Sequence, residues 1–134
     1  MPITLSALRD PAAARAILDS LPEWFGIPDA NDGYVRDVLD EGLNCLFAHD
    51  DERAVGVALV RRPFPQSAEL HLLAVSADAH RCGVGSTLVE RVAADLTADG
   101  ASFLTVHTVG PSLDNEPYRA TRAFYTAMGF VPLE

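Results

Sequence analysis

The stretch AHRCGVGSTLVERV, residues 79–92, holds two glycines one residue apart where a helix is expected to begin. Glycine costs about 1 kcal/mol relative to alanine inside a helix, so Gly83 and Gly85 indicate a need for bare backbone. A helix N-terminus offers free N–H groups and the positive end of the helix dipole. With no Cβ in the way, a phosphate group can approach these N–H groups. The spacing therefore predicts a site for a phosphate-bearing ligand, and a tight strand-to-helix turn without a ligand is the alternative.

Two common phosphate-binding motifs do not fit this loop. A P-loop requires a lysine followed by Ser or Thr, and no lysine follows these glycines. A dinucleotide-binding turn requires a third glycine where this chain has Leu88, and no ordinary strand–helix–strand repeat follows. The loop therefore belongs to neither class.

The elements that must position this loop follow from hydrophobic periodicity and from turn residues. Strands are expected at residues 3–8, 44–51, 54–62, 68–75, 102–109 and from 130 onward. Helices are expected at residues 9–24, 31–42, 85–100 and 119–129. The resulting order, β-α-α-β-β-β-α-β-α-β, predicts a mixed α/β (α+β) fold in which a strand–turn–helix unit follows consecutive strands.

Local signals predict the ends of the first two helices. Asp10 is a candidate N-cap and Pro11 fits the first helical position. The second helix is expected to begin at Asn31 or Asp32 and to end at Gly42.

Composition limits the class of protein. With 134 residues, 49% hydrophobic and 22% charged, the chain suits one globular domain rather than a disordered segment. No apolar run approaches the roughly 20 residues of a membrane span, and the N-terminus lacks the pattern of a signal peptide. We therefore expect a cytoplasmic protein. A net charge of −9 argues against nucleic-acid binding and favours a cationic partner or substrate, with plain solubility as the alternative.

Cysteine and histidine usage predicts no disulfide framework and no metal site. Cys45 and Cys82 lie far apart in unlike contexts, so both are expected to be reduced thiols. No histidine pair has the helical spacing of a metal site and no cysteine cluster supports one; the four are His49, His71, His80 and His107.

Two motifs together resemble the GNAT superfamily of acyl-CoA-dependent N-acyltransferases. Residues 80–85, HRCGVG, resemble the family pattern [QR]-x-x-G-x-[GA], with His80 in place of the usual Gln or Arg. Residues 122–130, RAFYTAMGF, resemble the second family signature, which carries a Phe-Tyr pair. The resemblance covers essentially the whole chain. It implies a single domain over residues 1–134, with a mixed, mostly antiparallel sheet flanked by about four helices.

The resemblance implies transfer of an acetyl group from acetyl-CoA to a primary amine, by direct attack in a ternary complex. The acceptor would be a small molecule or a peptide. The alternative is a non-catalytic, CoA-binding regulatory or assembly module with the same fold. The pyrophosphate of the cofactor would lie on the loop N–H groups, and its pantetheine arm would pair with the preceding strand. The matching positions are Leu73, Ala74, Val75, Arg81, Cys82, Gly83, Val84, Gly85 and Ser86.

The resemblance also assigns an acid and a base. A lysine-like amine with a pKa near ~10.4 is under about 0.1% neutral at pH 7, so a proton acceptor is useful. Glu69 is the candidate base and His71 the second choice; a solvent-facing carboxylate is the alternative for Glu69. Strict alternation would place Glu69 on one face with His71, Leu73 and Val75, unless a bulge intervenes.

Tyr125 is the candidate acid for the leaving thiolate, and it is also expected close to the cofactor sulfur. The alternative for Tyr125 is an aromatic side chain that packs with Phe124.

The acceptor pocket is expected between the first two helices and the sheet. Its candidate residues are Glu23, Trp24 and Phe25, with Tyr118 from the loop before the last helix. An aromatic wall beside a carboxylate suits a cationic amine, and a hydrophobic plug between helices is the alternative. The fold normally ends in a two-strand hairpin, so we expect the final strand to be missing, truncated or supplied by a partner. A homodimer is one candidate state.

Overall fold

The structure, a computed structural model, describes residues 2–107 and 116–132. These residues form five strands and four helices, which follow the expected order as far as the last helix. The strands are β1 (Ile3–Ser6), β2 (Asn44–Asp50), β3 (Arg53–Phe64), β4 (Ser67–Val75) and β5 (Phe103–Val106). The helices are α1 (Pro11–Asp19), α2 (Pro28–Asp37), α3 (Val84–Ala98) and α4 (Glu116–Ala127), with a short 3-10 turn, η1 (Ala77–Ala79), before α3.

The five strands form one sheet in the order β1-β2-β3-β4-β5. The first three pairs are antiparallel and the β4–β5 pair is parallel, so the predicted mixed, mostly antiparallel sheet is confirmed. β5 pairs with β4 only from Ser67 to Leu70. Within the described residues, the rest of β4 therefore has a strand neighbour on the β3 side only.

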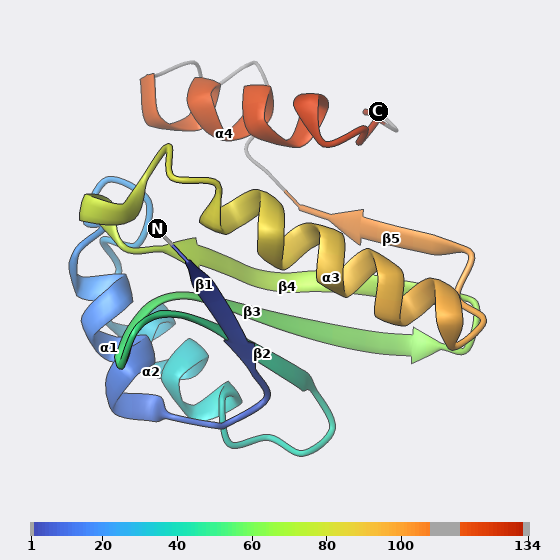
Figure 1. The fold of residues 1–134 in the computed structure, drawn as a ribbon, viewed down its shortest axis with the longest axis horizontal. Helices are drawn as coiled ribbons and strands as arrows, with labels where there is room; N and C mark the ends of the chain where they lie inside the picture. The colour runs from blue at the N-terminus through green and yellow to red at the C-terminus, as the bar shows by residue number, and fades with distance from the viewer. Residues whose placement is uncertain (1, 108–115, 133–134) are drawn as a thin grey trace.

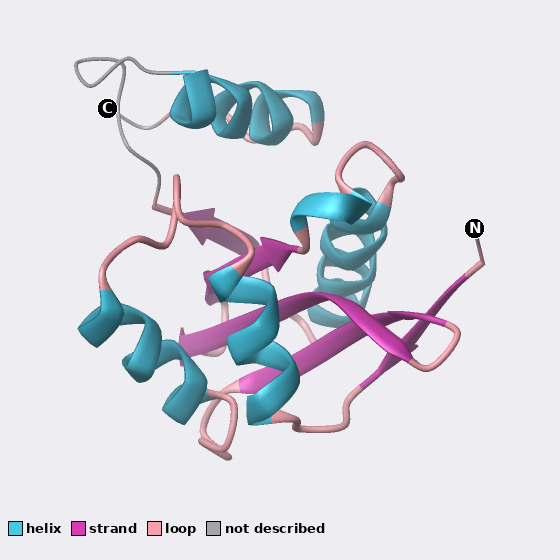
Figure 2. Cartoon of the chain, turned by 90° about the vertical axis from the view of Figure 1, so that its left-hand side faces the viewer, coloured by secondary structure: helices cyan, strands magenta, loops and turns pink. Residues whose placement is uncertain are grey.

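Helices cover both faces of the sheet (Figures 1 and 2). α1 packs on β3 and β4 and against α2, whereas α3 packs on the opposite face against β2, β3 and β4. Each face has its own apolar cluster, because strand side chains alternate between the faces. α4 lies on the α3 side, where its aromatic residues pack against that cluster.

The strand β4 carries one extra residue in its pairing with β3. Leu70 lies opposite Val60, but the next residue of β3, Leu59, lies opposite Leu72. His71 is therefore the extra residue of a β-bulge. Ala68 and Leu70 join the α3-side cluster before the bulge, and Leu72 and Ala74 join the α1-side cluster after it. Strict alternation along this strand is thus broken at His71.

The N-terminal signal of α1 is confirmed. The Asp10 carboxylate accepts a hydrogen bond of 3.1 Å from the Ala13 N–H, and Pro11 occupies the first helical position. This arrangement satisfies one of the N–H groups that a helix start leaves without a partner.

The predicted bounds of the second helix are wrong. α2 begins at Pro28, because proline fits a first helical position, and it ends at Asp37 rather than near Gly42. The Arg9 guanidinium donates hydrogen bonds to three carbonyl groups that follow the helix, those of Val38, Asp40 and Leu43. This long-range contact holds the chain in turns where local sequence favoured a longer helix.

The last helix also begins earlier than expected, at Glu116. Residues 130–132 form no strand, and residues 133–134 of the expected final strand lie outside the described residues. The expectation of a missing final strand therefore stays a prediction. None of the helices in the described ranges has the length and apolar character to cross a membrane.

We expect Asp10→Ala to lower the free energy of unfolding by about 1 kcal/mol, because it removes the N-cap acceptor of α1. Asp19→Ala is the matched control, since this exposed aspartate lies at the other end of the same helix. Urea titration of both variants measures the difference. Equal stabilities for the two variants would contradict the capping role.

Candidate functional site

The glycine loop leads from the end of β4 into α3. Gly83 is the N-cap of α3 and has a φ of +79°, a left-handed conformation that glycine adopts without steric cost. No side chain caps this helix start, in contrast to α1. The N–H groups of the first turn of α3 are therefore left for another acceptor. Arg81, with a φ of +66°, is exposed beside them and adds a positive charge.

Position 85 requires glycine for a different reason than position 83 does. A Cβ at this position would lie 3.2 Å from two ring carbons of Phe124, which belongs to α4. A contact this short requires the ring to move, so Gly85 permits α4 to pack on the first turn of α3. The sequence interpretation assigned both glycines to ligand approach, and the structure adds a packing role for this one.

Polar contacts anchor the chain just before the loop. The Arg53 guanidinium lies 2.5 Å from the Asp78 carboxylate, and the Ser76 hydroxyl donates to the same oxygen at 2.9 Å. The hydrogen bond from Arg53 holds the pKa of the Asp78 carboxyl below its ordinary value. The Ala77 N–H donates to the Ser20 hydroxyl at 3.1 Å, which ties the loop to the end of α1.

The far end of β4 has an open backbone edge. The Ser76 N–H donates to the Val55 carbonyl on the β3 side, and neighbouring residues of an antiparallel strand point alternately to its two sides. The backbone groups of Leu73 and Val75 therefore face away from β3, past the point where β5 ends its pairing. His80 Nε2 donates to the Val75 carbonyl at 2.8 Å. The structure thus supplies an exposed strand edge beside the glycine loop.

The bulge turns Glu69 and His71 toward α2, where a third residue joins them. His71 Nε2 lies 2.8 Å from the Asp37 carboxylate, and His71 Nδ1 lies 3.8 Å from Glu69 Oε1. Two further basic side chains lie near Glu69: Arg61 Nη1 is 3.8 Å from Oε1, and His107 Nε2 is 3.9 Å from Oε2. The His71 side chain is only 17% exposed and that of Glu69 28%, whereas the His107 side chain is 86% exposed.

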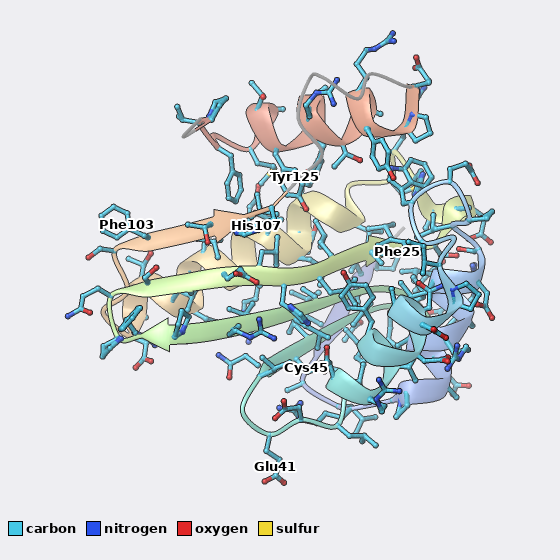
Figure 3. The ribbon with its side chains drawn as sticks, turned by 180° about the vertical axis from the view of Figure 1, so that it is seen from behind. Phe25, Glu41, Cys45, Phe103, His107 and Tyr125 are labelled. Carbon is cyan, nitrogen blue, oxygen red and sulfur yellow. The ribbon has the colours of Figure 1, made fainter. Side chains whose placement is uncertain are left out.

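An aromatic row borders the acid–base cluster. The Tyr34 ring makes an edge contact with His71 at a centroid distance of 5.5 Å, and Phe25 makes one with Tyr34 at 6.0 Å. Only the Tyr34 ring therefore separates Phe25 from His71, and Phe25 lies on the α1–α2 side of the sheet (Figure 3). Glu23, in the same segment, is exposed.

Trp24 points elsewhere. Its indole N–H donates to the Pro117 carbonyl at 3.1 Å and to the Thr121 hydroxyl at 3.0 Å, both in α4. Its ring also makes an edge contact with the His80 ring, at a centroid distance of 5.7 Å. Trp24 thus joins the α1–α2 loop to α4 and to the glycine loop. Tyr118 lies in the first turn of α4 and is half-buried.

Tyr125 lies on α4 among other aromatic rings, on the side of the helix that faces the sheet (Figure 3). Its ring makes edge contacts with Phe124 at 5.2 Å and with Phe130 at 5.3 Å. Burial raises the pKa of the Tyr125 hydroxyl to about 12. The hydroxyl is therefore a protonated hydrogen-bond donor throughout the neutral range.

The sequence interpretation gave no role in this site to Asp37, Arg61 or His107, which join the acid–base cluster. It also gave none to Tyr34, whose ring borders the cluster. No local sequence signal places Asp37 or Tyr34 in this site, because both lie on α2, far from β4 in the chain. A pairing of the strands would have suggested Arg61, which lies directly opposite Glu69.

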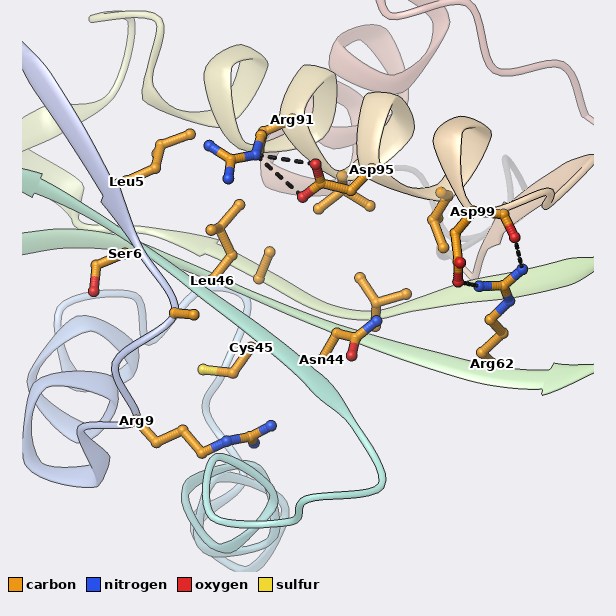
Figure 4. A pocket seen from close by; sticks show the side chains of 15 residues that line it. Leu5, Ser6, Arg9, Asn44, Cys45, Leu46, Arg62, Arg91, Asp95 and Asp99 are labelled. Atoms are coloured by element: carbon orange, nitrogen blue, oxygen red, sulfur yellow. Dashed lines mark hydrogen bonds and ion pairs between the residues drawn. The ribbon is translucent and has the colours of Figure 1, made fainter. Parts of the chain in front are cut away.

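A pocket of about 430 Å³ lies away from these residues, between α3 and the strands β1 and β2 (Figure 4). Its charged groups are largely paired: Arg91 bonds both oxygens of Asp95 at 3.1 Å, and Arg62 pairs with Asp99. It shares no residue with the predicted site. Within the described ranges, no three His, Cys, Asp or Glu side chains are grouped to hold a metal ion. Cys45 is buried and Cys82 exposed, and neither forms a disulfide.

Solved structures share this fold along nearly the whole chain. A protein described as an acetyltransferase of the GNAT family from Desulfovibrio desulfuricans has a TM-score of 0.84 at 23% identity, covering 99% of this chain and 86% of its own. The ribosomal-protein-S18-alanine N-acetyltransferase from Escherichia coli has a TM-score of 0.81 at 21% identity, covering 99% and 80%. An aminoglycoside 6'-N-acetyltransferase complexed with coenzyme A has a TM-score of 0.72 at 16% identity, covering 96% and 84%.

These likenesses define the architecture as the GNAT fold. The sequence model of the acetyltransferase (GNAT) domain matches residues 41–132, more than half of the chain. The chain therefore belongs to the GNAT acetyltransferase family. Members of this family typically use acetyl-CoA and acetylate amines. No curated protein matches the chain by sequence.

The raised pKa of Tyr125 predicts a loss of stability at alkaline pH. A tyrosine in an unfolded chain titrates near ~10, whereas Tyr125 in the folded protein titrates at about 12. The stabilisation from this difference is fully present below pH ~10 and is lost as pH rises through about 12. Urea titrations from pH 9 to 12 should therefore show a steeper fall for the wild-type protein than for Tyr125→Phe. Parallel curves would contradict the burial of this hydroxyl.

Proposed function

We propose that this chain is a single-domain N-acetyltransferase, spanning residues 1–134, that transfers an acetyl group from acetyl-CoA to a primary amine. One observation carries the proposal: β4 holds Glu69 and His71, then an open backbone edge, and then leads into the uncapped start of α3. An acid–base pair, a surface for an extended ligand and an anion site thus follow one another along a single strand. The donor set of the loop, amide N–H groups and one guanidinium, suits a pyrophosphate.

The proposed cofactor contacts divide between the loop and the strand. The residues from Arg81 to Ser86 would hold the pyrophosphate, through backbone N–H groups and the Arg81 side chain. The backbone of Leu73, Ala74 and Val75 would align the extended arm, as an added strand does at a sheet edge. His80 holds the Val75 carbonyl, so Leu73 is the residue of this edge whose carbonyl is best placed to accept.

The acetyl thioester supplies the group that is transferred. The amine nitrogen attacks the carbonyl carbon, so that a C–N bond forms and the C–S bond breaks with departure of the thiolate. The proton that the amine loses goes to Glu69 or His71, which lie together in a partly buried site. A general base here contributes roughly 10²- to 10⁴-fold to such a step.

Tyr125 would stabilise the leaving thiolate. Its pKa of about 12 lies well above the ~8.5 of a free thiol, so complete transfer of its proton to sulfur is unfavourable. A hydrogen bond from the hydroxyl to the developing thiolate is the role that this pKa supports.

The acceptor is proposed to be a cationic amine, carried by a small molecule or a peptide. Glu23, Trp24, Phe25 and Tyr118 are its proposed neighbours, and the carboxylates of the cluster would attract its charge. Two acceptors named for proteins with this fold, an alanine of a ribosomal protein and an aminoglycoside, are the first to test. All ten Lys and Arg residues of this chain are arginines, so its own side chains offer no lysine amine that would compete.

We expect acetyl-CoA to bind with a micromolar Kd in a calorimetric titration of the wild-type protein. Gly83→Asp should abolish binding, since it places a carboxylate at the proposed pyrophosphate site. Gly83→Asn is the matched control, because it has the same shape and the same strain at positive φ without the charge. Equal loss of binding in both variants would indicate backbone strain, and retention of binding in both would overturn the assigned loop.

We expect Tyr125→Phe to lower kcat by about tenfold to a hundredfold while the Kd for acetyl-CoA stays unchanged. Release of free thiol with a panel of amines measures turnover. Unchanged turnover would overturn the role of Tyr125. Binding of acetyl-CoA without turnover on any amine would favour the non-catalytic CoA-binding module instead.

A further inference from the structure

His71 is held between two carboxylates. Its Nε2 is 2.8 Å from Asp37 Oδ2 on α2, and its Nδ1 is 3.8 Å from Glu69 Oε1 on its own strand. The Tyr34 ring covers it from α2 at a centroid distance of 5.5 Å. With only 17% of the side chain exposed, the imidazole has little freedom to turn. Each ring nitrogen therefore faces a fixed partner.

The contact with Asp37 selects one tautomer of the imidazole. An ionised carboxylate accepts hydrogen bonds and cannot donate them. The proton of the neutral ring must therefore reside on Nε2, and the lone pair on Nδ1 is directed toward the Glu69 side. This leaves an unprotonated nitrogen beside the carboxylate that would attract an ammonium group.

The site offers two kinds of proton acceptor, a carboxylate and an imidazole. Free carboxyl groups titrate near ~4.3 and free imidazole near ~6.5, so an imidazole retains a proton better at neutral pH. A ring that gains a proton on Nδ1 becomes a cation flanked by carboxylates at both nitrogens.

We propose that His71 is the group that finally holds the proton of the acceptor amine, and that Asp37 is the positioning residue that orients it. This inference rests on the proposed function. Glu69 contacts the ammonium and His71 Nδ1 receives one proton, so the amine becomes neutral and the imidazole becomes cationic. Nothing is oxidised or reduced. The proton later leaves Nδ1 for solvent, to which 17% of the His71 side chain is exposed, and the starting tautomer is restored.

Other charged groups face this cluster and define the controls. Arg61 on β3 and His107 beyond β5 both approach Glu69, at 3.8 and 3.9 Å. The His107 side chain is 86% exposed, so water competes for its contact with Glu69. Arg61 approaches Oε1 of Glu69, the oxygen that also lies nearest His71 Nδ1, whereas His107 approaches Oε2. The dyad with Asp37 is therefore the arrangement to test.

Nitrogen-15 NMR of the histidine rings tests the orientation without any substrate. In the wild-type protein at pH 8, the His71 signals should be those of the tautomer with its proton on Nε2, and Asp37→Asn should weaken this preference. A wild-type ring with its proton on Nδ1 would overturn the inference. Because the measurement needs neither acetyl-CoA nor an amine, it is independent of the proposed function.

Kinetics test the role in the reaction. Asp37→Asn should lower kcat at least about tenfold, a fraction of what a positioned base contributes, with unchanged affinity for acetyl-CoA and an unchanged melting temperature. Asp37→Glu should recover part of the loss. Asp32→Asn is the matched control, since Asp32 lies on the same helix and pairs with Arg15 at 2.8 Å; it should retain wild-type turnover.

The outcomes separate the two claims. Equal turnover for Asp37→Asn and the wild-type protein would overturn the role of Asp37 alone. A wild-type protein that binds acetyl-CoA but turns over no amine would overturn the proposed function, and the catalytic role of His71 with it. A parallel fall in stability and in kcat for Asp37→Asn would assign Asp37 a purely structural role and so overturn the inference.

Discussion

The extra residue at His71 is the constraint on which the rest of the site depends. A strand of strict alternation would send Glu69 and His71 to the same face as Leu73 and Val75. With the bulge, the first two face α2, while the latter two pack with the α3-side cluster. One inserted residue therefore lets a single strand supply polar chemistry to one layer and apolar contacts to the other.

The fold could be predicted from the sequence because its signals are local. The Asp10 cap, the alternating strands and the apolar stripe of α3 each lie within one element, and the structure agrees with them. The end of α2 could not be predicted, since Arg9 stops it from a distance of about thirty residues. The glycine loop, Glu69 and His71 were found as candidates, but Asp37 was not, because only the tertiary fold brings it to β4.

The two glycines of the loop meet two separate demands. Gly83 supplies a left-handed backbone at an uncapped helix start, whereas Gly85 makes room for the Phe124 ring. The loop, the end of β4 and the helix α4 therefore pack as one unit. Trp24 extends this unit to the α1–α2 loop through its contacts with His80 and α4. The proposed cofactor side and the proposed acceptor side thus share a common support.

The bond between Trp24 and α4 has a consequence for the order in which the molecule can assemble. It joins residues 93 and 97 positions apart, whereas the β2–β3 and β3–β4 hairpins join near neighbours. Contacts of high sequence separation carry a large loop-closure cost and slow folding. The junction of Trp24, His80 and α4 is therefore expected to close after the two hairpins have formed.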